Sequence, residues 1–329
     1  MRLFIQKVGI YSTLLLLLNL GLGYFLYTYE RDLAGAGLFF PAARWADYYD
    51  QSGNIDLLVL GSSHAYRSYD PDVLKRALPG DPAVFNFGSS AQSPLTSYCL
   101  LREILRDHQP RLVVLDLYAL VFSENNQLNN GRFNLTSMRY GEGQKAFFRD
   151  AFSWKEKLQF LLFPSYVYRI NFEPKLKKLL GRKYLPKPKG TYRGEGFVFS
   201  PDTISVAQLQ NYNQFDRFDL GQNALLEQHL EYLVDIKKYC DEREIPLVFF
   251  SAPVPEITKD KIDYYDTFSE IFAGYARELN VPFRDANRAR FSGIRDAEHY
   301  CDDDHLNEAG ARLYSQAIVP LVEAYFTEY

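Results

Sequence analysis

Three side chains of the sequence could together perform acyl transfer by a serine. That chemistry needs an exposed hydroxyl, a histidine that takes its proton, an acid that orients the histidine, and donors for the developing oxyanion. Ser63 follows closely on the apolar run 55–60. Asp302 lies three residues before His305, directly ahead of a segment that Asn307 could cap as a helix. A tight turn at this spacing can direct the acid and the histidine into one pocket.

Each of these residues also has a purely structural interpretation. Ser63 could cap a helix or occupy a turn, and His305 could be a structural histidine. A second acid–histidine pair, Asp296 and His299, stands six residues earlier in the chain. It lacks the helix start that follows His305, so we rank it below the later pair.

Three neighbours of the candidate residues receive structural interpretations. Asp303 and Asp304 stand between the acid and the histidine, and we interpret both as solvent-exposed acids of the turn. His64 directly follows Ser63, where it could line a pocket or simply pack in the turn.

The elements that must position these residues alternate in type along the chain. Continuous apolar runs, typical of buried parallel strands, are separated by segments with helical periodicity. This rhythm predicts a parallel sheet covered by helices on both faces. The predicted strands are Ile55–Leu60, Ala83–Phe87, Leu112–Leu117, Pro246–Ser251 and, more weakly, Val281–Asp285.

The block Gly61-Ser62-Ser63, combined with the late Asp302-x-x-His305 and the helix behind it, resembles the SGNH (GDSL-type) hydrolase superfamily. Serine in the middle of the first block is similar to the D-alanyl transfer (DltD-like) proteins, which serve membrane-bound O-acyltransferases acting on cell-surface polymers. The resemblance covers about 55–120 and 225–329. It implies a flavodoxin-like, three-layer α/β/α fold with a parallel sheet.

The resemblance also implies a role for each candidate residue. Ser63 would be the nucleophile, His305 the base and Asp302 the orienting acid. The backbone N–H groups of Ser63 and Gly88 would bind the oxyanion, since Gly88 matches the family's second block. The sequence departs from the third block, where Asp116–Tyr118 replaces the usual side-chain oxyanion donor.

Composition excludes several other classes of protein. The chain has 329 residues, is 47% hydrophobic and carries a formal net charge of −4, which indicates a globular protein and argues against a general nucleic-acid binder. Its cysteines, Cys99, Cys240 and Cys301, show neither metal-ligand spacing nor a disulfide framework. We expect neither a metal nor an organic cofactor.

The first thirty residues are typical of a membrane anchor. Residues 8–27 carry no charge, and twenty residues of helix span about 30 Å, the thickness of a bilayer's hydrocarbon core. Arg2 and Lys7 precede the run, which predicts a cytoplasmic N-terminus and an extracytoplasmic remainder. A cleaved signal peptide is the alternative, because residues 34–36 resemble a cleavage site.

The predicted domains are an anchor at 1–30, a linker at 31–54 and the α/β domain at 55–329. Residues 123–220 do not follow the α/β rhythm. We interpret them as an insertion into the α/β domain, and an independent domain is the alternative. Within these residues lies a cluster of cations that is either a solvated face or a contact for an anionic surface. The apolar, aromatic segment Phe160–Tyr168 precedes that cluster. The cations are Lys175, Lys177, Lys178, Arg182, Lys183, Lys187, Lys189 and Arg193.

These observations predict a single-pass protein of the cell membrane, in a bacterial envelope, whose α/β domain is an extracytoplasmic serine esterase or O-acyltransferase. The expected substrates are acyl esters of a cell-surface polysaccharide or related glycan. Water as the acceptor would give hydrolysis, and a sugar hydroxyl would give transfer. The expected partners are the acylated glycan or acyl donor and a membrane-bound O-acyltransferase, with no nucleic acid. The alternative is a non-catalytic accessory protein that binds polymer or such an acyltransferase.

Overall fold

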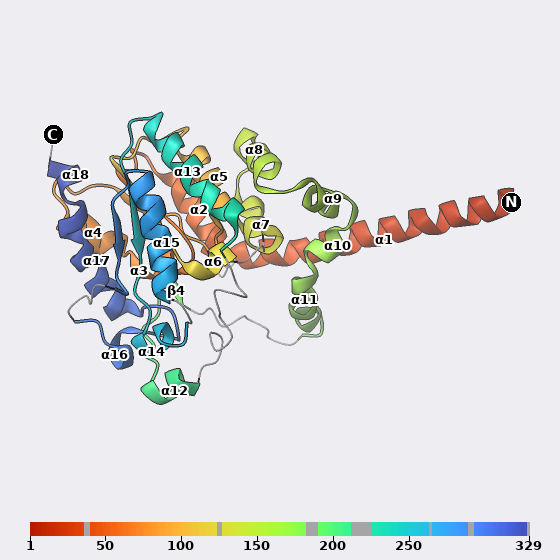
Figure 1. Cartoon of the computed structure of the whole chain (residues 1–329). Coiled ribbons are helices and arrows are strands. Elements are labelled where there is room, and N and C mark those ends of the chain that lie inside the picture. The colour runs from red at the N-terminus through yellow and green to blue at the C-terminus, as the bar shows by residue number, and fades with distance from the viewer. Residues whose placement is uncertain are drawn as a thin grey trace. The chain divides into compact units, whose positions relative to one another are not determined.

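The computed structural model describes residues 1–35, 40–123, 127–181, 190–211, 225–262, 265–288 and 293–327. The chain forms two compact units (Figure 1). The first comprises 1–43 and 131–188, and the second comprises 44–130 and 189–329.

The second unit is built around a five-stranded, fully parallel sheet in the order β2-β1-β3-β6-β7. Counting only its own strands, the order is 2-1-3-4-5, the flavodoxin-like form of the doubly wound α/β fold. Each predicted strand corresponds to one observed strand, so the predicted fold class is confirmed. The strands are β1 (Leu57–Leu60), β2 (Val84–Asn86), β3 (Leu112–Asp116), β6 (Leu247–Ser251) and β7 (Phe283–Asp285).

The central strands are buried on both faces, which explains their continuous apolar sequences. Leu57 pairs in register with Val84 on one side and Leu112 on the other. Leu57 and Val84 belong to a cluster that includes Tyr314 and Ile318 of helix α17 (Glu308–Val322). Side chains at alternate positions point to opposite faces of a sheet, so the intervening residues meet a second layer of helices.

Helices cover both faces of this sheet. Helix α17 contacts both α3 and α4 on one side, and α5 and α13 contact each other on the opposite side (Figure 1). The helices of this unit are α3 (Ser63–Ser68), α4 (Pro71–Ala77), α5 (Pro94–Ile104), α6 (Ala119–Ser123), α12 (Val206–Asn211), α13 (Glu227–Asp241), α14 (Glu256–Lys259), α15 (Tyr265–Glu278), α16 (Asp296–His299), α17 and α18 (Ala324–Thr327).

The predicted linker at 31–54 contains a helix of the α/β core, which corrects the sequence interpretation. Helix α2 (Phe40–Asp50) contributes Trp45, whose side chain is fully buried, with its ring centroid 4.9 Å from that of Phe87. Tyr48 packs against Phe85 and Phe87. The segment is rich in aromatic rings because it covers the outer face of β2.

The predicted insertion is divided between the two units. Its hairpin of β4 (Thr191–Gly194) and β5 (Phe197–Phe199) belongs to the α/β unit. The backbone N–H of Asn86 donates to the carbonyl of Glu195 at 2.9 Å. The hairpin thus supplies an acceptor for a backbone group of β2, which lies at the edge of the sheet.

The first unit gathers the long N-terminal helix and the helical part of the insertion. Helix α1 is long and apolar enough to cross a membrane. This unit consists of α1 (Arg2–Gly35), most of α7 (Gln127–Ser137), α8 (Glu142–Ala151), α9 (Trp154–Leu162), α10 (Pro164–Val167), the 3₁₀ turn η1 (Arg169–Asn171) and α11 (Phe172–Leu179).

The burial of Trp45 predicts a large loss of stability on truncation. We expect Trp45→Ala to lower the free energy of unfolding by about 3–5 kcal/mol, because a buried indole is replaced by a cavity. The matched control is Val234→Ala on α13, where the side chain is exposed and the change should stay within about 0.5 kcal/mol. Denaturant unfolding of the full chain in detergent measures both. Equal stability of the two variants would restore the linker interpretation.

Candidate active site

Ser63 is the first residue of α3, which follows strand β1 in the chain after Gly61 and Ser62. Ser62 caps the helix, since its hydroxyl accepts the N–H of His64 at 3.3 Å. Gly61 has a φ of +146°, and a Cβ there would lie 2.9 Å from the Cβ of Ala65, so the turn from strand to helix requires glycine. Ser63 is half-buried at the carboxyl edge of the sheet, where doubly wound folds place their sites.

Asp302 and His305 are brought together by the turn that precedes α17. An antiparallel bridge between Tyr300 and Leu306 closes the turn. The Asp302 carboxylate accepts the backbone N–H of His305 at 2.8 Å and lies 2.9 Å from Nδ1 of its ring. Asn307 caps α17, as the sequence predicted. The turn therefore fixes both the position and the orientation of the imidazole.

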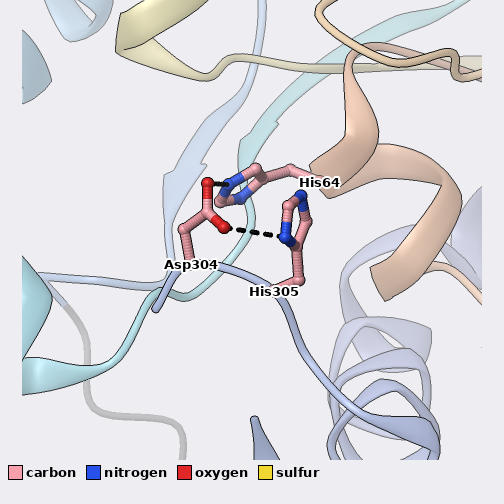
Figure 2. Close-up of side chains that lie close together, drawn as sticks. All are labelled: His64, Asp304 and His305. Carbon is pink, nitrogen blue, oxygen red and sulfur yellow. Dashed lines mark ion pairs between the residues drawn. The ribbon is translucent and has the colours of Figure 1, made fainter. Parts of the chain in front are cut away.

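A second carboxylate, that of Asp304, lies between two histidine rings (Figure 2). Its Oδ1 is 2.7 Å from Nδ1 of His305, and its Oδ2 is 3.5 Å from Nε2 of His64. The hydroxyl of Tyr118 donates to the same Oδ2 at 2.9 Å. Tyr118 also stacks on His64, with ring centroids 3.6 Å apart. Sequence reasoning did not connect these four residues.

The interpretation of Asp303 and Asp304 as exposed turn acids is wrong. Their exposed fractions are 4% and 7%. The hydroxyl of Thr258 donates to the carbonyl of Asp303, which holds this part of the turn against the protein. The acids are buried because the turn folds inward onto the end of β3, next to Tyr118.

The two carboxylates around His305 control its protonation. Burial alone would lower the pKa of His305, but Asp304 and Asp302 outweigh it and raise the pKa to about 9. Burial likewise opposes ionisation of Asp304, yet the adjacent His305 and His64 hold its pKa well below the usual range. For His64, burial dominates and lowers the pKa. The arrangement therefore favours an Asp304 carboxylate beside a charged His305 and a neutral His64.

The second acid–histidine pair of the sequence, on the short helix α16, bonds to backbone groups instead. The carboxylate of Asp296 accepts the backbone N–H groups of Glu256 and Ile257 and so binds the start of α14. Nδ1 of His299 accepts the backbone N–H of Arg295 at 2.9 Å. Both residues are thus occupied by backbone groups of the loops around them.

Gly88 does not present its N–H group as the resemblance implied. That N–H donates to the side chain of Asn86 at 3.0 Å. A Cβ at Gly88 would lie 2.9 Å from the carbonyl of Ser62 and from the N of Tyr66. Glycine is required here because the end of β2 passes close to α3. Ser63 remains the oxyanion candidate, as its N–H belongs to the first helical turn, whose N–H groups lack partners within the helix.

The residues in place of the third family block have other roles. Asp116 accepts the hydroxyl of Tyr69 at 2.8 Å and the backbone N–H of Ala252 at 3.0 Å, and burial raises its pKa to about 7. Tyr118 directs its hydroxyl at Asp304. Neither side chain therefore supplies the expected oxyanion donor.

His305 keeps one ring nitrogen uncommitted. Its Nε2 is buried and has no hydrogen-bond partner in the described part of the chain. The His305 ring lies beside that of His64, which directly follows Ser63, with ring centroids 5.2 Å apart. The nitrogen that would take the serine proton is thus available, although no bond joins it to Ser63 in this structure.

The same cluster contains groups that could bind a metal ion. His64, Asp304 and His305 each offer one ligand atom, and these atoms lie within 4.8 Å of one another. Their mutual contacts already pair each carboxylate oxygen with a donor or a cation. The expectation that no metal is needed stays a prediction.

Comparisons with known proteins give only distant similarities. No protein-family model matches the chain, and no curated protein matches its sequence. In structure it is similar to a protein from Bacteroides fragilis described provisionally as an acylhydrolase, at 10% identity and a TM-score of 0.40, covering 84% of this chain and 90% of that one. It is also similar to a GDSL-like lipase from Bacteroides thetaiotaomicron, at 11% identity and a TM-score of 0.42, covering 86% and 97%. The fold assignment rests on the sheet topology itself.

The paired carboxylates predict an unusually basic His305. We expect its imidazole to titrate near pH 9 in the full chain, followed by NMR with labelled histidine. Asp304→Asn should lower this pKa, because a neutral amide no longer stabilises the imidazolium, so the proton leaves at lower pH. Asp296→Asn, which removes a carboxylate bonded elsewhere, is the control and should leave the titration unchanged. A His305 pKa near 6.5 in the unaltered chain would contradict this assignment.

Proposed function

We propose that this chain is a serine acyl hydrolase or O-acyltransferase of the SGNH type. The observation that carries the proposal is the Asp302–His305 pair, held at the carboxyl edge of the sheet beside the turn that contains Ser63. Two segments distant in sequence thus supply the hydroxyl, the base and the orienting acid that acyl transfer by a serine requires, and the closeness of His64 to His305 supports their cooperation.

The proposed reaction proceeds through an acyl-enzyme. The Ser63 hydroxyl attacks the ester carbonyl while Nε2 of neutral His305 takes its proton, and the carbonyl oxygen becomes an oxyanion. The tetrahedral intermediate collapses, and His305 returns the proton to the departing alkoxide. A water or sugar hydroxyl then attacks the acyl-serine by the same steps, which regenerates Ser63. Asp302 holds the imidazole in the required orientation throughout.

We further propose that the substrates are acyl esters of a cell-surface polysaccharide. An apolar helix preceded by cations supports a membrane anchor with the α/β domain outside the cell. The Gly-Ser-Ser block and its similarity to D-alanyl transfer proteins support a glycan substrate and a membrane-bound O-acyltransferase as partner. Both inferences follow from the sequence and its resemblance.

A non-catalytic accessory role is the second candidate. It is favoured by the commitment of the Gly88 N–H to Asn86, and by Tyr118 in place of a third oxyanion donor. In that case the Asp302–His305 pair would be a structural remnant within a binding surface. The two candidates differ in whether Ser63 reacts with electrophiles.

Covalent labelling distinguishes the two candidates. A fluorophosphonate probe should label the full chain, and Ser63→Ala or His305→Ala should abolish labelling and lower ester turnover by roughly 10⁴-fold. The double variant should be no worse than either single one, since the groups act as a unit. Asp302→Asn should cost less, and Asp296→Asn should keep activity nearly intact. Absence of labelling in the unaltered chain would favour the accessory role.

The anchor makes a separate prediction about topology. A periplasmic or extracellular reporter fused to the C-terminus, where the α/β unit ends, should be active, because Arg2 and Lys7 keep the N-terminus in the cytoplasm. Replacing both cations by Glu should reduce that activity. A fusion that is active only in the cytoplasm would overturn the proposed location.

A further inference from the structure

Two short helices of the first unit present apolar stripes to their surroundings. On α9, Trp154, Leu158, Leu161 and Leu162 are 42–66% exposed. Their spacing of i, i+4, i+7 and i+8 places them on one face of the helix. Globular proteins rarely leave such contiguous apolar surface in water.

Helix α11 repeats this pattern. Phe172, Leu176, Leu179 and Leu180 have the same spacing and are 42–65% exposed. The much longer α/β unit exposes few large apolar side chains among its described residues, namely Val206, Val234 and Leu321. The exposed apolar surface is therefore concentrated in the unit that contains the candidate anchor.

Both helices contact α1. The end of α9 meets it at Asn19, and Lys175 of α11 meets it further along, at Thr28. From Leu3 to Leu22, which we call the bare segment, the large apolar side chains of α1 are mostly exposed. Gly23 and Leu26, by contrast, are buried within the unit. Twenty residues of helix extend about 30 Å, enough to cross the hydrocarbon core. The bare segment ends about five residues before the predicted span of 8–27 does, which moves the outer membrane boundary to about Leu22. Lys7 lies near the cytoplasmic end of the segment, from where its long side chain can reach the headgroups.

Asn19, a polar residue of this bare segment, forms hydrogen bonds with the groups at the break between α9 and α10. The amide of Asn19 donates to the carbonyl of Leu162, and its oxygen accepts the N–H and hydroxyl of Ser165. A Cβ on Gly23 would lie 2.6 Å from Pro164, so the helices pack closely here. In water, solvent could satisfy these backbone groups, but in lipid they need partners within the protein.

Helix α11 also makes polar contacts. Lys175 on α11 donates to the hydroxyl of Thr28 at 2.9 Å, and Lys177 pairs with Glu173. Of the basic cluster predicted from the sequence, Arg193 pairs with Asp70 and Glu308 in the α/β unit. Arg182, Lys183, Lys187 and Lys189 lie outside the described residues.

We propose that α9 lies in the outer leaflet on the flank of α1, with its apolar stripe in contact with lipid acyl chains, and that α11 lies at headgroup depth just outside it, with its apolar stripe toward the acyl chains. Asn19 is three residues, or about 5 Å, inside the end of the bare segment. Interfacial amphipathic helices insert to about 5–10 Å, which matches this depth. The anchor and the two helices together form a base at the outer face of the membrane.

Trp154 provides a native probe, because the other tryptophan, Trp45, is fully buried in the α/β core. The full chain is reconstituted in vesicles of phosphatidylcholine with bromine on the upper acyl chains. These lipids should reduce the Trp154 emission by at least about twofold, as expected at interfacial depth. Trp154→Phe should remove the quenched component and leave the emission of Trp45.

A matched pair of variants tests the stripe itself. Leu158→Asp on α9 should abolish bromine quenching and expose Trp154 to aqueous acrylamide. Leu321→Asp on α17 places the same change at a leucine of similar exposure, 38% against 42%, and should have no effect on quenching. Emission from Trp45 reports that each variant folds.

Two outcomes would overturn the proposal. If acrylamide but not bromolipid quenches Trp154 in the unaltered chain, α9 is exposed to water. If neither quencher reaches Trp154, a second copy of the chain covers the stripe in place of lipid. Because the readout is fluorescence, both outcomes are independent of whether Ser63 is reactive.

Discussion

The buried carboxylate of Asp304 determines how the candidate site is arranged. An ionised acid removed from water is stable only when it is paired and hydrogen-bonded. Here the compensation comes from His305, Tyr118 and His64, which belong to three different elements. Removing one partner of such a pair typically costs about 3–5 kcal/mol, since the remaining charge stays buried. The need to pair this buried carboxylate therefore holds the end of β3, the start of α3 and the turn before α17 close together.

The same carboxylate affects the chemistry proposed for the site. Two acids on one imidazole stabilise its charged form, so His305 is a stronger base but is less often neutral at physiological pH. A general base performs best when its pKa is near the working pH. The raised pKa therefore favours mildly alkaline conditions, or a substrate whose binding shields Asp304 from the ring. Tyr118 and His64 also bind the Asp304 carboxylate. They therefore weaken its stabilisation of the His305 imidazolium and limit the rise in the pKa of His305.

The sequence made the sheet and the Asp302–His305 pair predictable, because both depend on local order. Apolar runs identify buried strands, and a three-residue spacing ahead of a cap identifies a turn. Asp304 was misjudged because three consecutive acids are typical of an exposed turn, whereas the burial of Asp304 depends on the distant Tyr118. Gly88 was assigned a role by its match to the family pattern, whereas its close packing against α3 depends on tertiary structure. Helix α2 was missed because its short, mixed composition has no clear period.

In both units, polar groups that are removed from water find partners within the protein, although the surroundings of the two units differ. In the α/β unit, Asp304 is buried by protein, and its partners are side chains from other elements. In the first unit, Asn19 lies on a helix whose neighbouring residues are exposed, yet its amide nitrogen and oxygen both bond to the break between α9 and α10. Such pairing beside exposed leucines is unnecessary in water and required in hydrocarbon. The pairing of Asn19 thus indicates that lipid surrounds this part of the unit, which the apolar stripes alone do not indicate.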